Sequence, residues 1–157
     1  SLYDGLNPRA TGASDMTFLS DPDIWPLGEE DQDELLTRRA ITFAREQPGR
    51  TAWLAAAKFG RYWRPWPDAD GFRSVALAAL SATFTLPLFA LMAVGAWASR
   101  HDLRVLVLLA GPILYFCVLH LAFASSMRYR IPGEVPALAL ASIGLGRVLK
   151  PARRGVA

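Results

Sequence analysis

The residues best suited to chemistry form a short basic and aromatic link, Arg128-Tyr129-Arg130-Ile131-Pro132, between two apolar segments. Guanidinium groups at the edge of a hydrocarbon layer are costly unless they meet water, a lipid phosphate or an anionic substrate. They bind phosphate through directed, bidentate hydrogen bonds, and a tyrosine hydroxyl can donate another. The link therefore predicts that Arg128, Tyr129 and Arg130 bind a lipid phosphate. Plain anchoring at the membrane interface is the alternative.

Four further residues are candidates for supporting this site. Lys58 and Arg61 lie on the basic side of a predicted helix and are expected to assist on the phosphate. His120 is a candidate hydrogen-bond partner of the site, with a purely structural role near the end of its apolar segment as the alternative. Glu134 is expected to pair with one of the arginines or to cap the following helix, rather than to act as a general base.

Two helices are predicted before the apolar half of the chain. The first begins near Asp31, with acids early and arginines later as the helix dipole prefers, and Pro48-Gly49 ends it. The second covers residues 50–64, where about 100° per residue places cations on one side and small and aromatic residues on the other. The two sets are Arg50, Lys58, Arg61 and Arg64, and Ala52, Ala55, Ala56, Phe59, Tyr62 and Trp63.

This division is typical of a helix that lies in the membrane interface, with its rings among the lipid headgroups. A soluble helix packed on a neighbouring domain is the alternative. Basic residues interleaved with aromatic ones also occur in nucleic-acid binders, but the adjacent apolar spans exclude nucleic acid as the expected partner.

Three apolar blocks must position the link. Val75–Ala98 carries no charge and is long enough to cross a hydrocarbon core of roughly 30 Å. Val105–Ala124 is the second predicted span, interrupted by Gly111-Pro112. The third block, Val135–Val148, is short for a full crossing unless it is counted from Ile131, since Pro132 can occupy a first helical turn.

The sequence thus predicts an all-α membrane protein, and 52% hydrophobic residues in 157 is too apolar for an ordinary soluble domain. Residues 1–74 are expected to form an extracytoplasmic loop with interfacial amphipathic helices. Residues 75–149 are expected to form a three-helix transmembrane region, and residues 150–157 a basic cytoplasmic tail, as the placement of cations favours. A polar start without methionine indicates the C-terminal piece of a longer protein.

The link also carries a family resemblance. With His120 upstream and Pro136 downstream, Arg128-Tyr129-Arg130-Ile131-Pro132 resembles the link before the last span of bacterial membrane glycosyltransferases of the GT-C superfamily. That superfamily includes the protein O-mannosyltransferases and the aminoarabinose transferases. The resemblance covers roughly residues 33–149. It includes a stretch similar to the one these proteins carry before their final spans, namely Ala44–Arg50 followed by Leu54, Lys58, Phe59 and Trp63.

The resemblance implies a transferase of the bacterial inner membrane that takes a sugar from a polyprenyl-phosphate carrier at the extracytoplasmic face. It places the catalytic acid in the first external loop of the full protein, and nothing in this chain matches that loop. The catalytic residue is therefore expected outside this chain. The sequence indicates no cofactor, leaves a divalent metal open and does not define the acceptor. A non-catalytic membrane anchor or assembly subunit is the alternative function.

Overall fold

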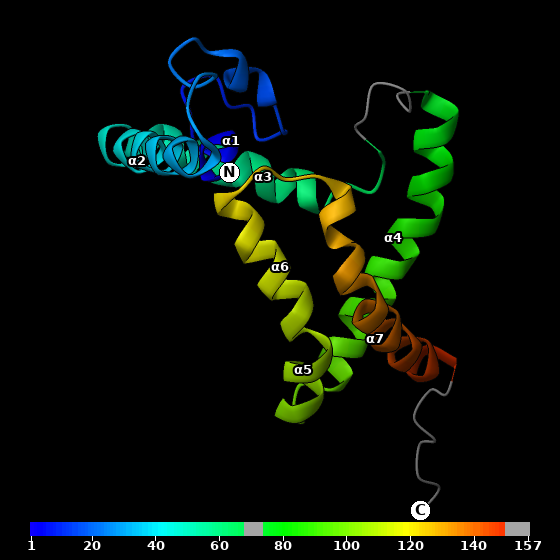
Figure 1. Cartoon of the computed structure of the whole chain (residues 1–157). Coiled ribbons are helices and arrows are strands. Elements are labelled where there is room, and N and C mark those ends of the chain that lie inside the picture. The colour runs from blue at the N-terminus through cyan, green and yellow to red at the C-terminus, as the bar shows by residue number, and fades with distance from the viewer. Residues whose placement is uncertain (68–73, 150–157) are drawn as a thin grey trace, which may run out of the picture. The chain divides into compact units, whose positions relative to one another are not determined.

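The computed structural model describes residues 1–67 and 74–149, and the described residues form helices without any strand (Figure 1). This confirms the all-α prediction. The chain divides into two compact units. The first unit joins Ser1–Arg64 to Cys117–Tyr129, and the second comprises the described residues of Pro65–Phe116 and Arg130–Ala157. The predicted cytoplasmic tail, residues 150–157, lies outside the described residues.

The first unit is built on two consecutive helices, α2 (Glu29–Glu46) and α3 (Pro48–Tyr62). Three acids occupy the first turn of α2 and Arg45 occupies its last turn, which matches the helix dipole. Pro48 stands in the first turn of α3, where a missing N–H costs nothing. A short helix α1 (Leu2–Gly5) packs against α2, and the core between these elements consists of Leu6, Ala10, Ala40, Phe43 and Leu54.

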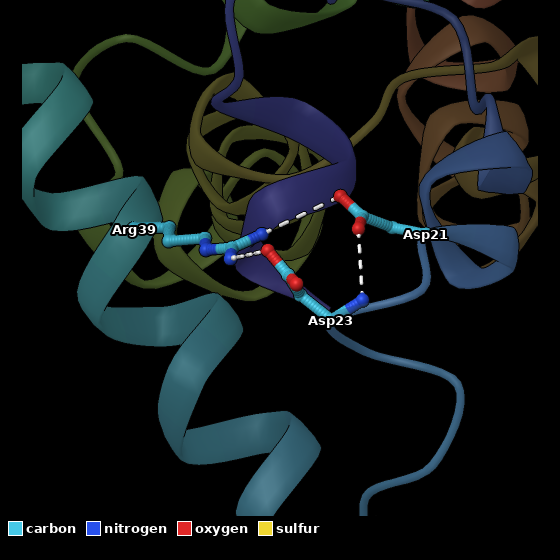
Figure 2. Close-up of polar contacts among 3 residues, drawn as sticks. All are labelled: Asp21, Asp23 and Arg39. Carbon is cyan, nitrogen blue, oxygen red and sulfur yellow. Dashed lines mark hydrogen bonds and ion pairs between the residues drawn. The ribbon is translucent and has the colours of Figure 1, made fainter.

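The polar stretch before α2 is fastened to that helix by an arginine. The 3₁₀ helix η1 (Met16–Ser20) ends at Asp21, whose carboxylate accepts a hydrogen bond from the N–H of Asp23 at 3.0 Å. Arg39 of α2 reaches both acids, at 3.7 Å from Asp21 and 3.5 Å from Asp23, as Figure 2 shows. The adjacent Ile24 is completely buried, so the turn is packed as well as ion-paired.

The second unit is organised by the crossing of α4 (Val75–Ala98) and α7 (Ile131–Leu149), visible in Figure 1. Two glycines allow the backbones to approach closely. A Cβ on Gly95 would collide with the carbonyl of Leu140, and a Cβ on Gly144 with that of Leu91. Small residues at a helix crossing permit this approach, as is common in membrane helix pairs.

The membrane prediction is confirmed only in its coarser form. Within the described residues, α4 is long and apolar enough to cross a membrane, and its bounds match the predicted first span. The predicted second span is two helices, α5 (Leu103–Leu109) and α6 (Gly111–Ala122), bent by 48°. Pro112 explains the break, because it has no N–H to continue the helical ladder.

The third predicted span does not meet the same criterion. The helix α7 contains Glu134 in its first turn, Arg147 in its last turn and Pro136 between them, all of which lower its apolar character. The structure therefore supplies one helix able to cross a membrane, or two if the bent pair α5–α6 counts as one span, among the residues it describes. Three complete transmembrane helices remain a prediction.

Candidate functional site

The first two residues of the predicted phosphate-binding link lie in the first unit, within the 3₁₀ helix η3 (Met127–Arg130). Arg128 is exposed, and its guanidinium makes no hydrogen bond or ion pair within residues 1–67 and 74–149. Tyr129 is half-buried. A charged group without an internal partner is available to an anion from outside the protein.

Tyr129 stacks on His120, with ring centroids 4.3 Å apart and planes inclined by 14°. The Nδ1 atom of His120 lies 3.1 Å from the carbonyl oxygen of Ala124. Because a carbonyl can only accept, Nδ1 carries the hydrogen, and Nε2 is the ring nitrogen left for another partner. The stacking on Tyr129 and the hydrogen bond to Ala124 together fix the orientation of the His120 imidazole.

Lys58 is directed toward the end of α6 and is completely buried. Its Nζ donates to the carbonyl oxygens of Leu121 at 2.9 Å and Ala122 at 2.8 Å. Carbonyls at a helix C-terminus lack partners within the helix, and a cation there is favoured by the helix dipole. Burial lowers the pKa of Lys58 to about 8, against the opposing effect of the Asp4 carboxylate. Its ammonium thus holds two parts of the first unit together.

The contact between α1 and the end of α6 is equally close. A Cβ on Gly5 would collide with the carbonyl of Ala122 and would lie 2.9 Å from the Nζ of Lys58. Only glycine allows the backbone of α1 to come this near. The Lys58 ammonium is therefore enclosed by backbone on two sides, and no lipid phosphate contacts it in this arrangement.

The cationic side of α3 faces inward. Arg50 donates to the carbonyl of Ala10 at 3.1 Å, and its guanidinium lies 4.3 Å from the ring centroid of Trp53. Arg61, the other predicted helper on this helix, is half-buried and engaged by a partner. On the predicted apolar side Phe59 is 51% exposed but Tyr62 is buried, and Trp53, which lies beside Arg50, is 52% exposed. The predicted amphipathic division of α3 is therefore partial.

Arg130 belongs to the second unit, where it is 6% exposed. Its Nε lies 3.3 Å from Oε1 of Glu134, one helical turn later, and its guanidinium lies 4.9 Å from the ring centroid of Phe89. The expected pairing of Glu134 with one of the arginines is confirmed. Arg130 is therefore engaged within the protein, in contrast to Arg128.

Ser125 precedes the link and was not among the predicted site residues. Its N–H donates to the carbonyl of Gly12 at 3.0 Å, and its hydroxyl is buried without a hydrogen-bond partner among the described residues. Such a group is uncommon in a folded protein. Nothing in the local sequence indicates this burial, because it arises from a contact between distant parts of the chain.

The described residues include no group of three or more His, Cys, Asp or Glu side chains that could hold a metal ion. The fold and the site together define an all-helical protein with at least one helix suited to crossing a membrane, which supports membrane association. Comparisons with protein-family models, curated proteins and solved structures found no match to the chain.

Proposed function

We propose that this chain is the C-terminal portion of an integral membrane glycosyltransferase that uses a polyprenyl-phosphate-linked sugar at the extracytoplasmic face of the inner membrane. In this proposal the Arg-Tyr-Arg link contacts the lipid phosphate. The observation that carries it is the state of Arg128, which is exposed and without a hydrogen bond or ion pair in the described part of the chain. A guanidinium so placed can accept a phosphate without breaking an existing contact.

The chemistry assigns different tasks to the residues of the link. Arg128 neutralises the phosphate, and charge that develops on the departing polyprenyl phosphate is stabilised by this cation. Tyr129 donates a hydrogen bond from its hydroxyl while its ring rests on His120. Arg130 fixes the start of α7 through Glu134, and its direct contact with phosphate remains a prediction. The catalytic acid is supplied from outside this chain.

The proposed topology places α4, the pair α5–α6 and α7 in the bilayer. The region before α4 and the link face outward, and the tail faces the cytoplasm. The exposed Trp53 and Phe59 of α3 support an interfacial position for that helix, because aromatic rings favour the headgroup layer. Lipid is therefore the partner that would cover this apolar side.

A second candidate is a non-catalytic membrane anchor or assembly subunit. The observation that favours it is the internal engagement of Lys58 and Arg130. Both are buried cations with protein partners, as expected of residues that only stabilise a fold. Under this candidate Arg128 is an interface anchor and has no preference for a phosphate.

The test is binding of a long-chain polyprenyl monophosphate to the protein in nanodiscs, compared with the matching polyprenol. Arg128→Ala should weaken phosphate binding by about 10- to 100-fold, the usual range for losing a hydrogen-bonded charge. Arg128→Lys should lose less, because it keeps the charge without the bidentate geometry. Arg104→Ala is the matched control, an exposed arginine in the first turn of α5.

The two candidates give opposite results. A transferase portion prefers polyprenyl phosphate to polyprenol, and that preference falls in Arg128→Ala while Arg104→Ala retains it. An anchor binds polyprenyl phosphate and polyprenol equally, in the wild type and in both alanine variants. Equal binding would refute the phosphate role of the link.

A further inference from the structure

A cavity of about 500 Å³ lies in the first unit, in a part of the chain to which the proposed phosphate site assigns no role. It opens to the surface and is lined by residues of the N-terminal 22 positions, from α1, η1 and the turn that follows. Its volume is in the range of small-molecule sites, which is about 300–1,000 Å³. The lining residues that matter for its chemistry are Tyr3, Arg9, Asp15, Phe18, Ser20 and Asp21.

The walls of this N-terminal cavity are held in place by hydrogen bonds. The buried carboxylate of Asp4 accepts from the Ser14 hydroxyl at 2.7 Å and from the N–H of Asp15 at 2.8 Å. Asp15 in turn caps η1 by accepting from the N–H of Thr17 at 3.1 Å. The rings of Tyr3 and Phe18, on opposite elements, meet edge to face at 5.2 Å.

The far wall is fixed independently. Asp21 is held by the ion pair with Arg39 and by the N–H of Asp23, as in Figure 2. These two contacts restrict the position of its carboxylate. Sites with such preset polar groups bind small molecules without the cost of ordering their side chains.

The polar groups of the cavity combine donors and acceptors. Asp15 can only accept, Arg9 can only donate, and the hydroxyl of Ser20 can do both. Hydrogen bonds from Thr17 and, more weakly, the charge of Arg9 lower the pKa of Asp15, which keeps its carboxylate ionised. Arg39 already pairs with Asp21 and the charge of Arg9 acts on Asp15, so the lining offers no surplus positive charge to a phosphate or carboxylate ligand.

A ligand that suits this lining has hydroxyl groups that both donate and accept, an apolar face for an aromatic ring, and no negative charge. We propose that the N-terminal cavity binds a neutral saccharide, with Asp15 and Arg9 on its hydroxyls and the Tyr3–Phe18 pair against its apolar face. This inference does not rest on the proposed transferase function. If both hold, the cavity and the phosphate-binding link are separate sites on one protein.

The experiment titrates the protein in nanodiscs with methyl glucoside, methyl mannoside, methyl galactoside and N-acetylglucosamine, followed by saturation-transfer NMR. Detergents with sugar headgroups are avoided because they would compete. Glucose against glucose 6-phosphate tests the preference for a neutral ligand. Asp15→Asn removes the charge yet preserves the cap of η1, because asparagine caps as well as aspartate. Asp23→Asn is the matched control, since Asp23 does not line the cavity.

We expect saturable binding of at least one neutral sugar, weakened about tenfold in Asp15→Asn and unchanged in Asp23→Asn. Ser20→Trp places a large ring in the cavity and should abolish binding while thermal unfolding stays as in the wild type. Three results would overturn the proposal. They are no saturable binding of any neutral sugar, binding unaffected by both Asp15→Asn and Ser20→Trp, and tighter binding of glucose 6-phosphate than of glucose.

Discussion

Replacing Lys58 by methionine tests whether this buried cation holds the first unit together. The substitution keeps most of the side-chain volume and removes the donors to the carbonyls of Leu121 and Ala122. Each of the two carbonyls that loses its partner costs about 1–3 kcal/mol. Removing a desolvated charge recovers part of this loss, so we expect a net destabilisation of about 1–3 kcal/mol. Lys58→Ala adds a cavity and should cost about 3–5 kcal/mol.

The assay combines thermal unfolding in nanodiscs with hydrogen exchange of peptides covering residues 117–126. In a chain of this size each kcal/mol lowers Tm by about 2–4 °C. Exchange should accelerate at the amide of Ser125, which donates to Gly12 across the same contact. Arg45→Met, at an exposed position on α2, is the control for loss of a cation. Equal Tm and equal exchange in Lys58→Met and Arg45→Met would refute the reasoning.

The pH dependence of stability gives a second readout of the same residue. The pKa of Lys58 falls from its ordinary 10.5 to about 8 in the folded protein, mainly because of burial. Between these values the unfolded chain holds the proton and the folded chain has released it, so stability rises with pH across this window. The neutral amine keeps two N–H donors for the two carbonyls. Lys58→Met should remove this rise.

Three further predictions test other contacts. His120→Asn can still donate in place of Nδ1 and should fold normally with weaker binding of polyprenyl phosphate, whereas a purely structural histidine predicts unchanged binding. Arg130→Ala should cost about 1–3 kcal/mol, mainly because it removes a buried side chain that packs on Phe89, and Glu134→Gln should cost less because the amide can still accept from Arg130 and that side chain is 40% exposed. In unfolding assays Gly144→Ala should destabilise through its collision with α4, while Gly146→Ala, whose Cβ meets open space, should stabilise by up to about 1 kcal/mol.

Features governed by neighbours along the chain were predictable. The bounds of α4 follow from 24 residues without a charge, and the break before Pro112 follows from the missing N–H of proline. The pairing of Arg130 with Glu134 follows from a spacing of four residues at the start of α7. In each case the deciding interaction spans one helix or one turn.

Contacts between distant segments were not predictable from the sequence. Lys58 and Ala122, which share a hydrogen bond, are 64 positions apart in the sequence. No pattern in either segment predicts that it contacts the other. The same holds for the bond between Ser125 and Gly12. These contacts place Cys117–Tyr129 in the first unit, although this segment follows α4 and α5 in the sequence. Dividing the chain into a polar first half and an apolar second half therefore separates residues that pack together.

The helix α3 shows that a helical wheel does not reveal what contacts each side of a helix. The periodicity places the cations on one side of the helix and Phe59, Tyr62 and Trp63 on the other. The same pattern results whether water, lipid or protein lies against either side. The N-terminal segment supplies the carbonyl of Ala10 to Arg50, and the end of α6 supplies two carbonyls to Lys58, so both cations have partners within the protein. The ring of Phe59, on the opposite side of α3, is exposed. A phosphate then has no access to Lys58, so within the first unit the proposed recognition of phosphate rests on Arg128 and Tyr129.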